Sequence, residues 1–420
     1  MLKPLDMGLK VMFRRGRFTL TDAGGKIYAY GDGDSSLPDV AAHFTDRATE
    51  RRILLDPRLG AAEAFMDGRL VLDRGDVMAL TELARAGKPF EEMAPQKQGR
   101  IARAKRNIRQ RLRHANHHRA ARANVAHHYD LDDRLYDRFL DPWRQYSCAY
   151  WTDDTPDLAA AQRAKIAHIA AKLGLSEGQH VLDIGCGWGG MAIALHKLAG
   201  VRVTGVTLSV QQQRYATAWA QREGVADMVD FRLIDYRDVT GQFDRIVSVG
   251  MFEHVGVPNY AAFFAKCREL LSRDGVMLLH TIGRIGGPGE TDAFTRKYIF
   301  PGGYIPALSE VMPAREANRL ILTDAEVLRL HYAHTLRAWY AACIAAREEI
   351  EAFYDARFFR MWTFYLAGAT AAFEGGGMAN FQLQYARDRT TLPLTRDYIA
   401  AREAEYRARL DSLASAAPVS

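Results

Sequence analysis

Between about residues 126 and 300, short apolar runs alternate with stretches in which apolar residues recur at helical spacing. Short, almost uninterrupted apolar runs are typical of parallel strands that are buried on both faces. An alternation of such strands with helices predicts a doubly wound α/β sheet. The predicted strands are His180–Ile184, Arg202–Thr207, Val229–Leu233, Arg245–Val249 and Val276–His280, and the predicted helices are Met191–Leu198, Gln211–Glu223 and Tyr260–Leu271.

The pattern differs on either side of this region. Residues 1–95 contain strand-like runs separated by Gly/Asp turns and closed by a helical pattern, which predicts a small α+β domain. After about residue 305 the pattern is mostly helical to the end, and we assign residues 126–420 to one catalytic domain. In the N-terminal domain the predicted strands are Arg17–Leu20, Lys26–Tyr30 and Arg52–Leu55, and the helix is Asp76–Ala86.

A basic segment separates the two domains. The chain of 420 residues has a net charge of +6, but Lys97–Arg122 alone holds ten Lys or Arg and no acidic residue. The rest of the chain is therefore at −4. Apolar residues recur at helical spacing here, which predicts an amphipathic basic helix at 96–125. Such a helix serves as a solvated linker, or it binds an anionic membrane surface or nucleic acid.

Targeting and metal-binding signals are missing from the sequence. No window reaches the roughly 18 consecutive apolar residues of a membrane-spanning helix. The first 17 residues lack the apolar core and cleavage site of a secretory signal. The four cysteines include no C-x-x-C pair, so neither a disulfide framework nor a metal site is expected. We therefore predict a cytoplasmic protein.

A glycine-rich loop follows the first strand of the predicted sheet. Gly185, Gly187 and Gly190 satisfy the dinucleotide pattern G-x-G-x-x-G. That pattern requires an acid about 20 residues further on, at the end of the second strand. The second strand ends at Val206–Ser209 without one, whereas Asp183 stands just before the first glycine. The order Asp183, Gly185, Gly187, Gly189 resembles class I methyltransferases, in which the carboxylate positions the methionine part of S-adenosylmethionine.

Polar residues follow the next two strands at the same edge of the predicted sheet. Thr207, Ser209 and Gln212 come after the second strand and are candidates for the ribose. Asp235 and Tyr236 come after the third strand and offer a carboxylate for the adenine amino group and a ring for the base. Each pair alone is common, and their order along the sheet is what favours a nucleotide-like cofactor.

Several further motifs resemble the cyclopropane-fatty-acyl-phospholipid synthase family, which includes the mycolic acid cyclopropane synthases. The resemblance covers about residues 124–387 closely and the N-terminal domain loosely. A generic methyltransferase would share only the glycine loop. The motifs are His127–Asp130, Phe139–Asp141, Tyr146–Trp151, Gly205–Ser209, Met251–Gly256, His280–Gly283 and Arg360–Trp362.

This resemblance implies a reaction on an unsaturated acyl chain of membrane phospholipid. A methyl group moves from S-adenosylmethionine to one carbon of a cis double bond, a carbocation forms on the neighbouring carbon, and loss of a proton from the new methyl closes a cyclopropane ring. The base is held to be bound bicarbonate. The resemblance also assigns Tyr146 and Ser147 to the cofactor, and it places the bicarbonate cage at Cys148, Glu253, His280, Ile282 (largely through its backbone) and Tyr332.

One position departs from the family pattern. Some members carry a cysteine shortly after the motif that is Phe364–Leu366 here, whereas this chain continues with Ala367–Ala369. A cysteine nucleophile at that position is excluded, and the chemistry needs none because the alkene is the nucleophile. Aromatic residues between Phe353 and Tyr365 either form helix core or line a dry pocket for the cation. The Gly/Pro-rich segment Gly283–Tyr304 is predicted to be a mobile lid or acyl-channel loop.

The implied substrate bears on the basic segment. Acyl chains of phospholipids lie in a bilayer, so Lys97–Arg122 is predicted to dock the enzyme on the anionic inner membrane surface as a peripheral protein. A nucleic-acid-binding methyltransferase is disfavoured because an RNA-binding module and an Asn/Asp-Pro-Pro-aromatic base pocket are both missing. A related lipid C-methyltransferase, giving a methyl-branched or methylene product, is the alternative within the enzymes. The family also suggests a homodimer.

Overall fold

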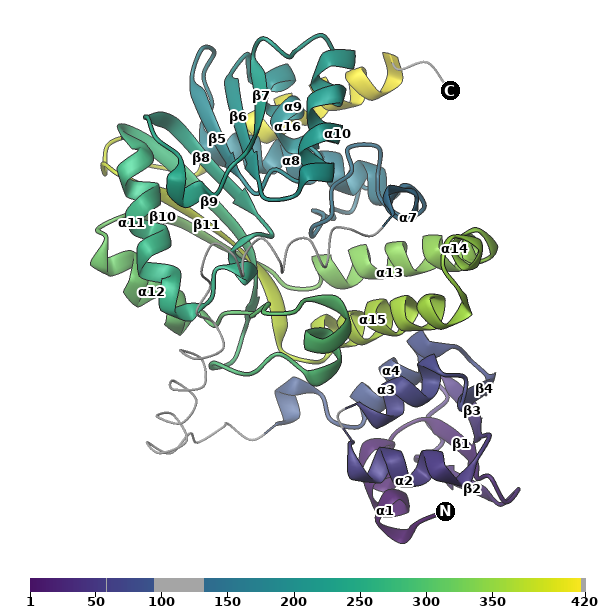
Figure 1. The fold of residues 1–420 in the computed structure, drawn as a ribbon. Helices are drawn as coiled ribbons and strands as arrows, with labels where there is room; N and C mark the ends of the chain where they lie inside the picture. The colour runs from purple at the N-terminus through teal and green to yellow at the C-terminus, as the bar shows by residue number, and fades with distance from the viewer. Residues whose placement is uncertain (58, 94–131, 417–420) are drawn as a thin grey trace.

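A mixed sheet forms the centre of the larger part of the molecule (Figure 1). The computed structural model describes residues 1–57, 59–93 and 132–416. Within these residues the sheet has seven strands in the order β10-β11-β9-β8-β5-β6-β7. The five predicted strands pair in parallel, as expected of a doubly wound sheet. The strands are β5 (His180–Ile184), β6 (Arg202–Thr207), β7 (Val229–Leu233), β8 (Phe243–Val249), β9 (Leu271–Arg284), β10 (Ile321–Leu328) and β11 (Met378–Ala386).

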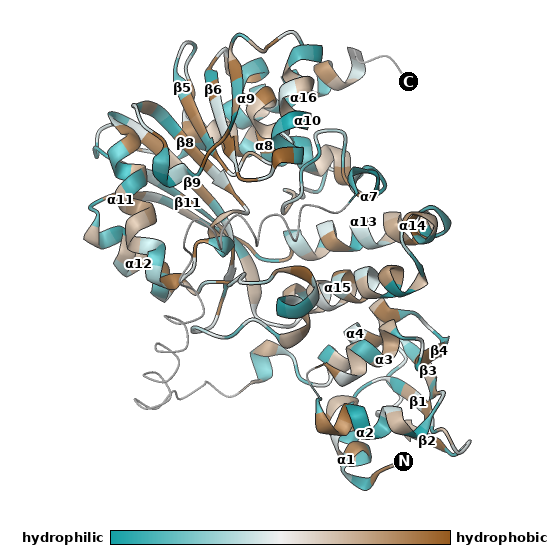
Figure 2. Cartoon of the chain, in the orientation of Figure 1, coloured by the Kyte–Doolittle hydropathy of each residue, from teal (hydrophilic) through white to brown (hydrophobic). Residues whose placement is uncertain are grey.

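Helices cover both faces of this sheet, and successive strand residues point to opposite faces. Val181 packs into one apolar core and its neighbour Leu182 into another. Figure 2 shows the central strands β5 and β8 as largely hydrophobic. The core around Val181 includes residues of α8 (Leu158–Leu173), α9 (Gly190–Ala199), α10 (Val210–Arg222) and α16 (Asp397–Ala416), and the core around Leu182 includes residues of α11 (Tyr260–Leu270) and α12 (Leu308–Ala317).

The prediction that the chain is mostly helical after residue 305 is wrong in part. Strands β10 and β11 extend the sheet as antiparallel neighbours of β9. Within β11, amide side chains alternate with apolar ones at Asn380, Gln382 and Gln384. This period-2 pattern is typical of a strand. All three amides are buried and lie on one face, so the polar residues concealed a strand that is buried on both sides.

The N-terminal residues form a smaller unit around a four-stranded sheet with the order β2-β1-β3-β4, counted over the described residues. The predicted strand Arg52–Leu55 is wrong, because these residues end the helix α2. Asp46 caps that helix by accepting from the amide of Thr49, and Ile53 is buried while Leu55 is exposed. The elements are α1 (Lys3–Met12), β1 (Arg17–Thr21), β2 (Ile27–Tyr30), β3 (Asp39–Phe44), α2 (Arg47–Leu55), α3 (Gly60–Met66), β4 (Leu70–Arg74) and α4 (Val77–Ala86).

Two long helices lie between the N-terminal unit and the large sheet (Figure 1). They are α13 (His331–Ala345) and α15 (Ala356–Glu374), joined through α14 (Arg347–Phe353), and α15 packs against α3 and α4. The predicted basic helix at 96–125, including Lys97–Arg122, lies outside the described residues, so the proposed division into 1–95, 96–125 and 126–420 stays a prediction. Among the helices that are described, none combines the length and apolarity needed to cross a bilayer.

Candidate active site

The glycine loop between β5 and α9 brings backbone to the edge of a pocket. Gly185, Gly187 and Gly189 all have positive φ angles, of 86°, 54° and 90°, which residues other than glycine rarely adopt. Gly185 and Gly187 line the pocket. Gly189 does not line it; a Cβ there would lie 2.6 Å from the ring of Phe231, so this glycine serves the packing of the helix against the sheet.

Asp183 is the last but one residue of β5 and reaches into the same pocket. Its side chain is buried, and its Oδ2 has no hydrogen-bond partner among the described residues. Burial raises the pKa of the carboxyl to about 7, against the opposing influence of Lys165. A buried carboxylate oxygen without a partner is costly unless a ligand supplies a donor. Asp183 therefore marks the place for a ligand with an ammonium or N–H group.

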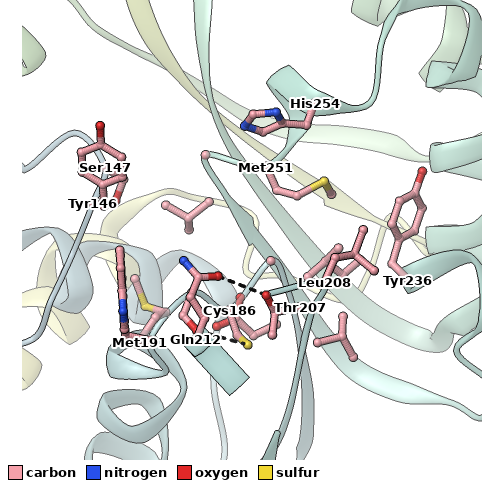
Figure 3. A pocket seen from close by; sticks show the side chains of 18 of the residues that line it. Tyr146, Ser147, Cys186, Met191, Thr207, Leu208, Gln212, Tyr236, Met251 and His254 are labelled. Atoms are coloured by element: carbon pink, nitrogen blue, oxygen red, sulfur yellow. Dashed lines mark hydrogen bonds between the residues drawn. The ribbon is translucent and has the colours of Figure 1, made fainter. Parts of the chain in front are cut away.

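The residues that follow β6 divide into two roles. Thr207 and Gln212 line the pocket, and the Thr207 hydroxyl donates to Gln212 Oε1 at 3.1 Å, the dashed line between them in Figure 3. Ser209 does not line the pocket. Its hydroxyl accepts from the backbone amide of Gln212 at 3.3 Å and caps α10. The predicted ribose contact of Ser209 is thus replaced by a structural one.

Asp235 and Tyr236 lie on the pocket wall after β7, and Figure 3 shows Tyr236 on the side opposite Tyr146 and Ser147. The Asp235 carboxylate accepts from the Arg237 guanidinium at 2.6 Å and from the Arg237 amide at 3.0 Å. Arg237 therefore neutralises the charge of Asp235, which still lines the pocket. Of the eleven predicted cofactor residues, all but Gly189 and Ser209 line this pocket.

A second cavity, of about 510 Å³, adjoins the first. All five residues of the predicted cage lie on its wall: Cys148, Glu253, His280, Ile282 and Tyr332. They come from a loop, from the turn after β8, from β9 and from α13, so the fold brings together positions nearly 200 residues apart. Their roles in catalysis stay predictions.

Glu253 presents one free carboxylate oxygen to this region. Its Oε1 accepts from the backbone amide of Ile282 at 2.6 Å, and its Oε2 is buried without a partner in the described part of the chain. Burial raises the pKa of this carboxyl. We predicted that the Ile282 backbone would contact bicarbonate. Its N–H instead donates to Glu253 and orients that side chain.

His280 sits at the centre of β9 and is completely buried. Burial lowers its pKa to about 3, so the imidazole is neutral near pH 7. Its Nε2 lies 3.2 Å from the amide nitrogen of Asn380, and its Nδ1 lies 3.2 Å from that of Gln382. Asn380 also lines the cavity, and sequence reasoning missed it. The alternation of amides along β11 was the signal that could have found it.

Cys148 and Tyr332 complete the predicted cage. Burial raises the pKa of the Cys148 thiol far above its ordinary value, so the sulfur is an uncharged donor rather than a nucleophile. The ring of Tyr332 packs edge-on to Phe373, with centroids 4.9 Å apart. The Cys148 thiol donates to the carbonyl of Ala149 at 3.3 Å. The wall therefore carries an uncharged thiol, imidazole and phenol, and such a wall is suited to a small oxyanion or to a dry apolar reaction.

A short wall is common to both cavities. Tyr146, Ser147, Gly250 and His254 line the first cavity and the second alike. Burial lowers the pKa of His254 to about 4, so its imidazole is also neutral. Any group that passes from one cavity to the other must pass these residues. His254 was part of a motif in the sequence but was not predicted as a site residue.

A buried lysine supports this wall from beneath. Lys165 of α8 is completely buried, and its Nζ donates to Gln145 Oε1 at 2.7 Å and to Ser147 Oγ at 2.8 Å. Gln162, one turn earlier, donates to the carbonyls of Gln145 and Ser147. Burial lowers the pKa of Lys165 to about 7. Lys165 and Gln162 therefore hold the 145–147 segment in place between the two cavities.

We expect Lys165→Met to weaken binding of S-adenosylmethionine about tenfold, because hydrogen bonds to a charged group contribute roughly 1.5–3 kcal/mol each and part of that loss falls on the position of Ser147. Titration calorimetry with the purified variant measures the change. Lys172→Met is the matched control: Lys172 is equally buried in the same helix but pairs with Asp324. Equal affinity loss in both variants would assign the effect to general destabilisation.

Three other parts of the chain line the second cavity. Phe364 and Tyr365 of α15 line it, whereas Phe359 and Trp362 pack in the helix core and do not. The predicted role of the aromatic rings toward a cation stays a prediction. The predicted acyl-channel loop contributes residues between Arg284 and Tyr304. The N-terminal unit contributes Pro57, Ala61, Ala62 and Arg85, which sequence reasoning did not place at any site because nothing in the local pattern marks a contact between distant segments.

The fold and the first pocket define a class I S-adenosylmethionine-dependent methyltransferase. The crystal structure of the mycolic acid cyclopropane synthase CmaA1 complexed with SAH and CTAB aligns with a TM-score of 0.60 and 35% identity, over 63% of this chain and 98% of that one. The SAH in that complex is consistent with a cofactor pocket at the glycine loop and Asp183 described above.

The family model for mycolic acid cyclopropane synthetase matches residues 116–383. The chain belongs to this family. It is 41% identical over 340 residues to the cyclopropane-fatty-acyl-phospholipid synthase of Escherichia coli (strain K12), covering 80% of this chain and 85% of the relative. It is 36% identical over 376 residues to the tuberculostearic acid methyltransferase UfaA1 of Mycobacterium tuberculosis (strain ATCC 25618 / H37Rv), covering 86% of each.

Proposed function

We propose that this enzyme forms cyclopropane rings in unsaturated acyl chains of membrane phospholipid. The observation that carries the proposal is the second cavity, whose apolar and aromatic wall suits an acyl chain and whose inner part holds Glu253, His280 and Tyr332 beside the cofactor pocket. The E. coli relative, named for this activity, supports the same assignment.

The residues of the first pocket fit S-adenosylmethionine. Asp183 Oδ2 is a buried acceptor without a partner, Gly185 and Gly187 allow close approach of backbone, and Thr207 and Gln212 offer polar groups between them. When bound, S-adenosylmethionine supplies an electrophilic methyl group. The wall at Tyr146, Ser147, Gly250 and His254 is where this methyl would meet the double bond, since the two cavities meet there.

The second cavity supports the rest of the reaction in two ways. Its aromatic side chains offer π-faces to a cation that forms on the acyl chain, and they exclude water that would capture it. Its uncharged polar side chains suit an oxyanion: Asn380, which contacts His280, and Tyr332 carry N–H and O–H groups for the oxygens of bicarbonate, and the Oε2 of Glu253, without a partner among the described residues, suits the bicarbonate hydroxyl. Such an anion would accept the proton that leaves the new methyl as the ring closes.

The test of this function is product identification. The purified enzyme is incubated with S-adenosylmethionine and vesicles of an unsaturated phospholipid, and the acyl chains are released and analysed by mass spectrometry and NMR. We expect each modified chain to gain one methylene and lose its double bond to a ring. Unchanged lipid would remove the proposed substrate.

A related lipid C-methyltransferase is the second candidate. Curated relatives include a probable fatty acid methyltransferase of Pseudomonas putida and the tuberculostearic acid methyltransferase UfaA1. Such an enzyme would use the same two cavities but leave a methyl-branched or methylene chain. Glu253, His280 and Tyr332 favour ring closure, because a base is needed close to the added methyl.

We also propose that the basic segment docks the enzyme on the anionic inner surface of the membrane. Arg106, Arg109, Arg111 and Arg113 lie in Lys97–Arg122, and each basic residue near such a surface contributes roughly 1 kcal/mol. Replacing all four with glutamine should weaken binding to anionic vesicles at least tenfold at low salt, with a smaller difference at high salt. Vesicle sedimentation measures this. Unchanged binding would remove the docking role.

A further inference from the structure

The N-terminal unit contributes one charged side chain to the second cavity. Arg85 lies in the last turn of α4 and lines the cavity, as do the apolar residues Ala61 and Ala62 of the same unit. Its aliphatic stem packs on Gly375, where an added Cβ would lie 2.8 Å from Arg85 Cγ. The glycine thus lets the arginine reach the cavity from the junction between α4 and the end of α15.

Other cations at this junction are neutralised by nearby carboxylates. Arg337 pairs with Glu374 at 2.5 Å and with Glu82 at 3.1 Å. Arg357 pairs with Asp67 at 2.8 Å, and Lys297 pairs with Glu63 at 2.7 Å. These pairs join the N-terminal unit to α13, to α15 and to the loop over the cavity. None of these four carboxylates is among the charges that act on Arg85.

The guanidinium of Arg85 has no such partner. Among the described residues it makes no hydrogen bond or ion pair, and burial lowers its pKa. A partly buried guanidinium without a counter-ion loses hydration that nothing in the protein replaces. The sequence of residues 94–131, which follow this unit in the chain, contains a single acidic residue, Asp130.

Arg284 is the other guanidinium on the cavity wall. It donates to the backbone carbonyls of Ile305 at 3.3 Å and Glu290 at 2.9 Å, and the charges of Glu310 and Asp292 act on it. Neither Glu290 nor Asp292 is among the charges that act on Arg85. The cavity therefore has one compensated guanidinium, at the end of β9, and one uncompensated guanidinium, at the end of α4.

A guanidinium without a counter-ion, in the wall of a cavity suited to an acyl chain, would be neutralised by an anionic group attached to that chain. Guanidinium groups bind phosphate oxygens through two parallel hydrogen bonds. We propose that Arg85 binds the phosphate of the phospholipid whose acyl chain occupies the cavity. This inference rests on the proposed function, and it gives the N-terminal unit a direct part in choosing a phosphate-bearing lipid.

The test compares lipids that share their chains and differ in the phosphate. Wild type, Arg85→Met and Arg85→Lys are assayed in uncharged detergent micelles with dioleoyl phosphatidylcholine and with dioleoylglycerol. We expect Arg85→Met to lower kcat/KM for the phospholipid by about ten- to a hundredfold, through KM, and to leave the diacylglycerol within about twofold. Arg85→Lys should recover part of the loss. Lys88→Met, an exposed cation three residues further on, is the control and should behave as wild type on both lipids.

Equilibrium binding of the same lipids is measured alongside turnover, so the phosphate contact is tested separately from methyl transfer. The proposal would be overturned if Arg85→Met bound both lipids as tightly as wild type, or if its affinity for both lipids fell equally. Oleate is included as a third ligand, and a loss restricted to oleate would assign Arg85 to a free carboxylate and overturn the proposal. Inorganic phosphate should compete only weakly, because it lacks the chains; competition as strong as that of the lipid would also contradict the proposal. Absence of product from wild type with every lipid would instead refute the proposed function.

Discussion

Glu253→Gln should lower kcat by about 10²- to 10⁴-fold, the range typical for loss of a group that handles a proton in the transition state. The substitution keeps the size of the side chain and removes its charge. The amide would no longer offer two acceptor oxygens, one for the Ile282 amide and one for the cavity. Single-turnover kinetics with unsaturated phospholipid vesicles measures the change.

The same variant should bind S-adenosylmethionine within about twofold of wild type, because Glu253 lines the second cavity and not the first. Glu269→Gln, on the exposed side of α11, is the control for the loss of a carboxylate. Wild type assayed without bicarbonate should also slow and recover when bicarbonate is added. Full activity of Glu253→Gln, or indifference of wild type to bicarbonate, would contradict the proposed cage.

Asp183→Asn should weaken binding of S-adenosylmethionine by about ten- to a hundredfold, the equivalent of roughly 1.5–3 kcal/mol for a hydrogen bond to a charged group. The reason is that Asp183 Oδ2 is a buried acceptor whose partner must come from the ligand. Asp230→Asn, on the neighbouring part of the sheet and away from the pocket, is the matched control. Titration calorimetry compares the three proteins.

The pH dependence of this binding provides a second readout. Because burial raises the pKa of Asp183 to about 7, the carboxyl gains a proton as the pH falls through 7 and loses its attraction for a cationic ligand group. Affinity of wild type should therefore fall below pH 7 and level off above it, whereas Asp183→Asn should lack this step. An equal step in both proteins would place the titrating group elsewhere.

The parallel strands were predictable because burial on both faces leaves a continuous apolar run, as in Val276–Leu279. The run Ile53–Leu55 was misassigned because a short apolar cluster also occurs at the end of a helix, where only Ile53 is buried here, and the cap at Asp46 decides for the helix. Strand β11 was missed for the opposite reason: its buried face holds amides that bond to His280, Lys172 and Tyr398 instead of apolar side chains.

Motif spacing located the site but not the direction of each side chain. Asp183, Thr207 and Gln212 line the pocket as predicted, whereas Ser209 caps a helix and Gly189 packs against Phe231. Adjacency in a motif does not distinguish these roles, because neighbouring residues point in different directions at a strand end.

Support from distant segments was beyond sequence reasoning. Lys165 reaches Ser147 from a helix 18 residues away in the chain, and Asn380 reaches His280 across 100 residues. Arg85 arrives at the second cavity from the other unit of the molecule. Only the packing of α8, β11 and α4 brings these side chains to the site, and a one-dimensional pattern does not contain that packing.

The most direct test of ring formation uses S-adenosylmethionine with a fully deuterated methyl group and a phospholipid with one cis double bond. If the enzyme forms a cyclopropane ring, we expect a product that keeps two of the three deuterium atoms, has no remaining double bond and shows cyclopropane resonances by NMR. A chain that keeps all three deuterium atoms, or one that retains an alkene beside the added carbon, would contradict it.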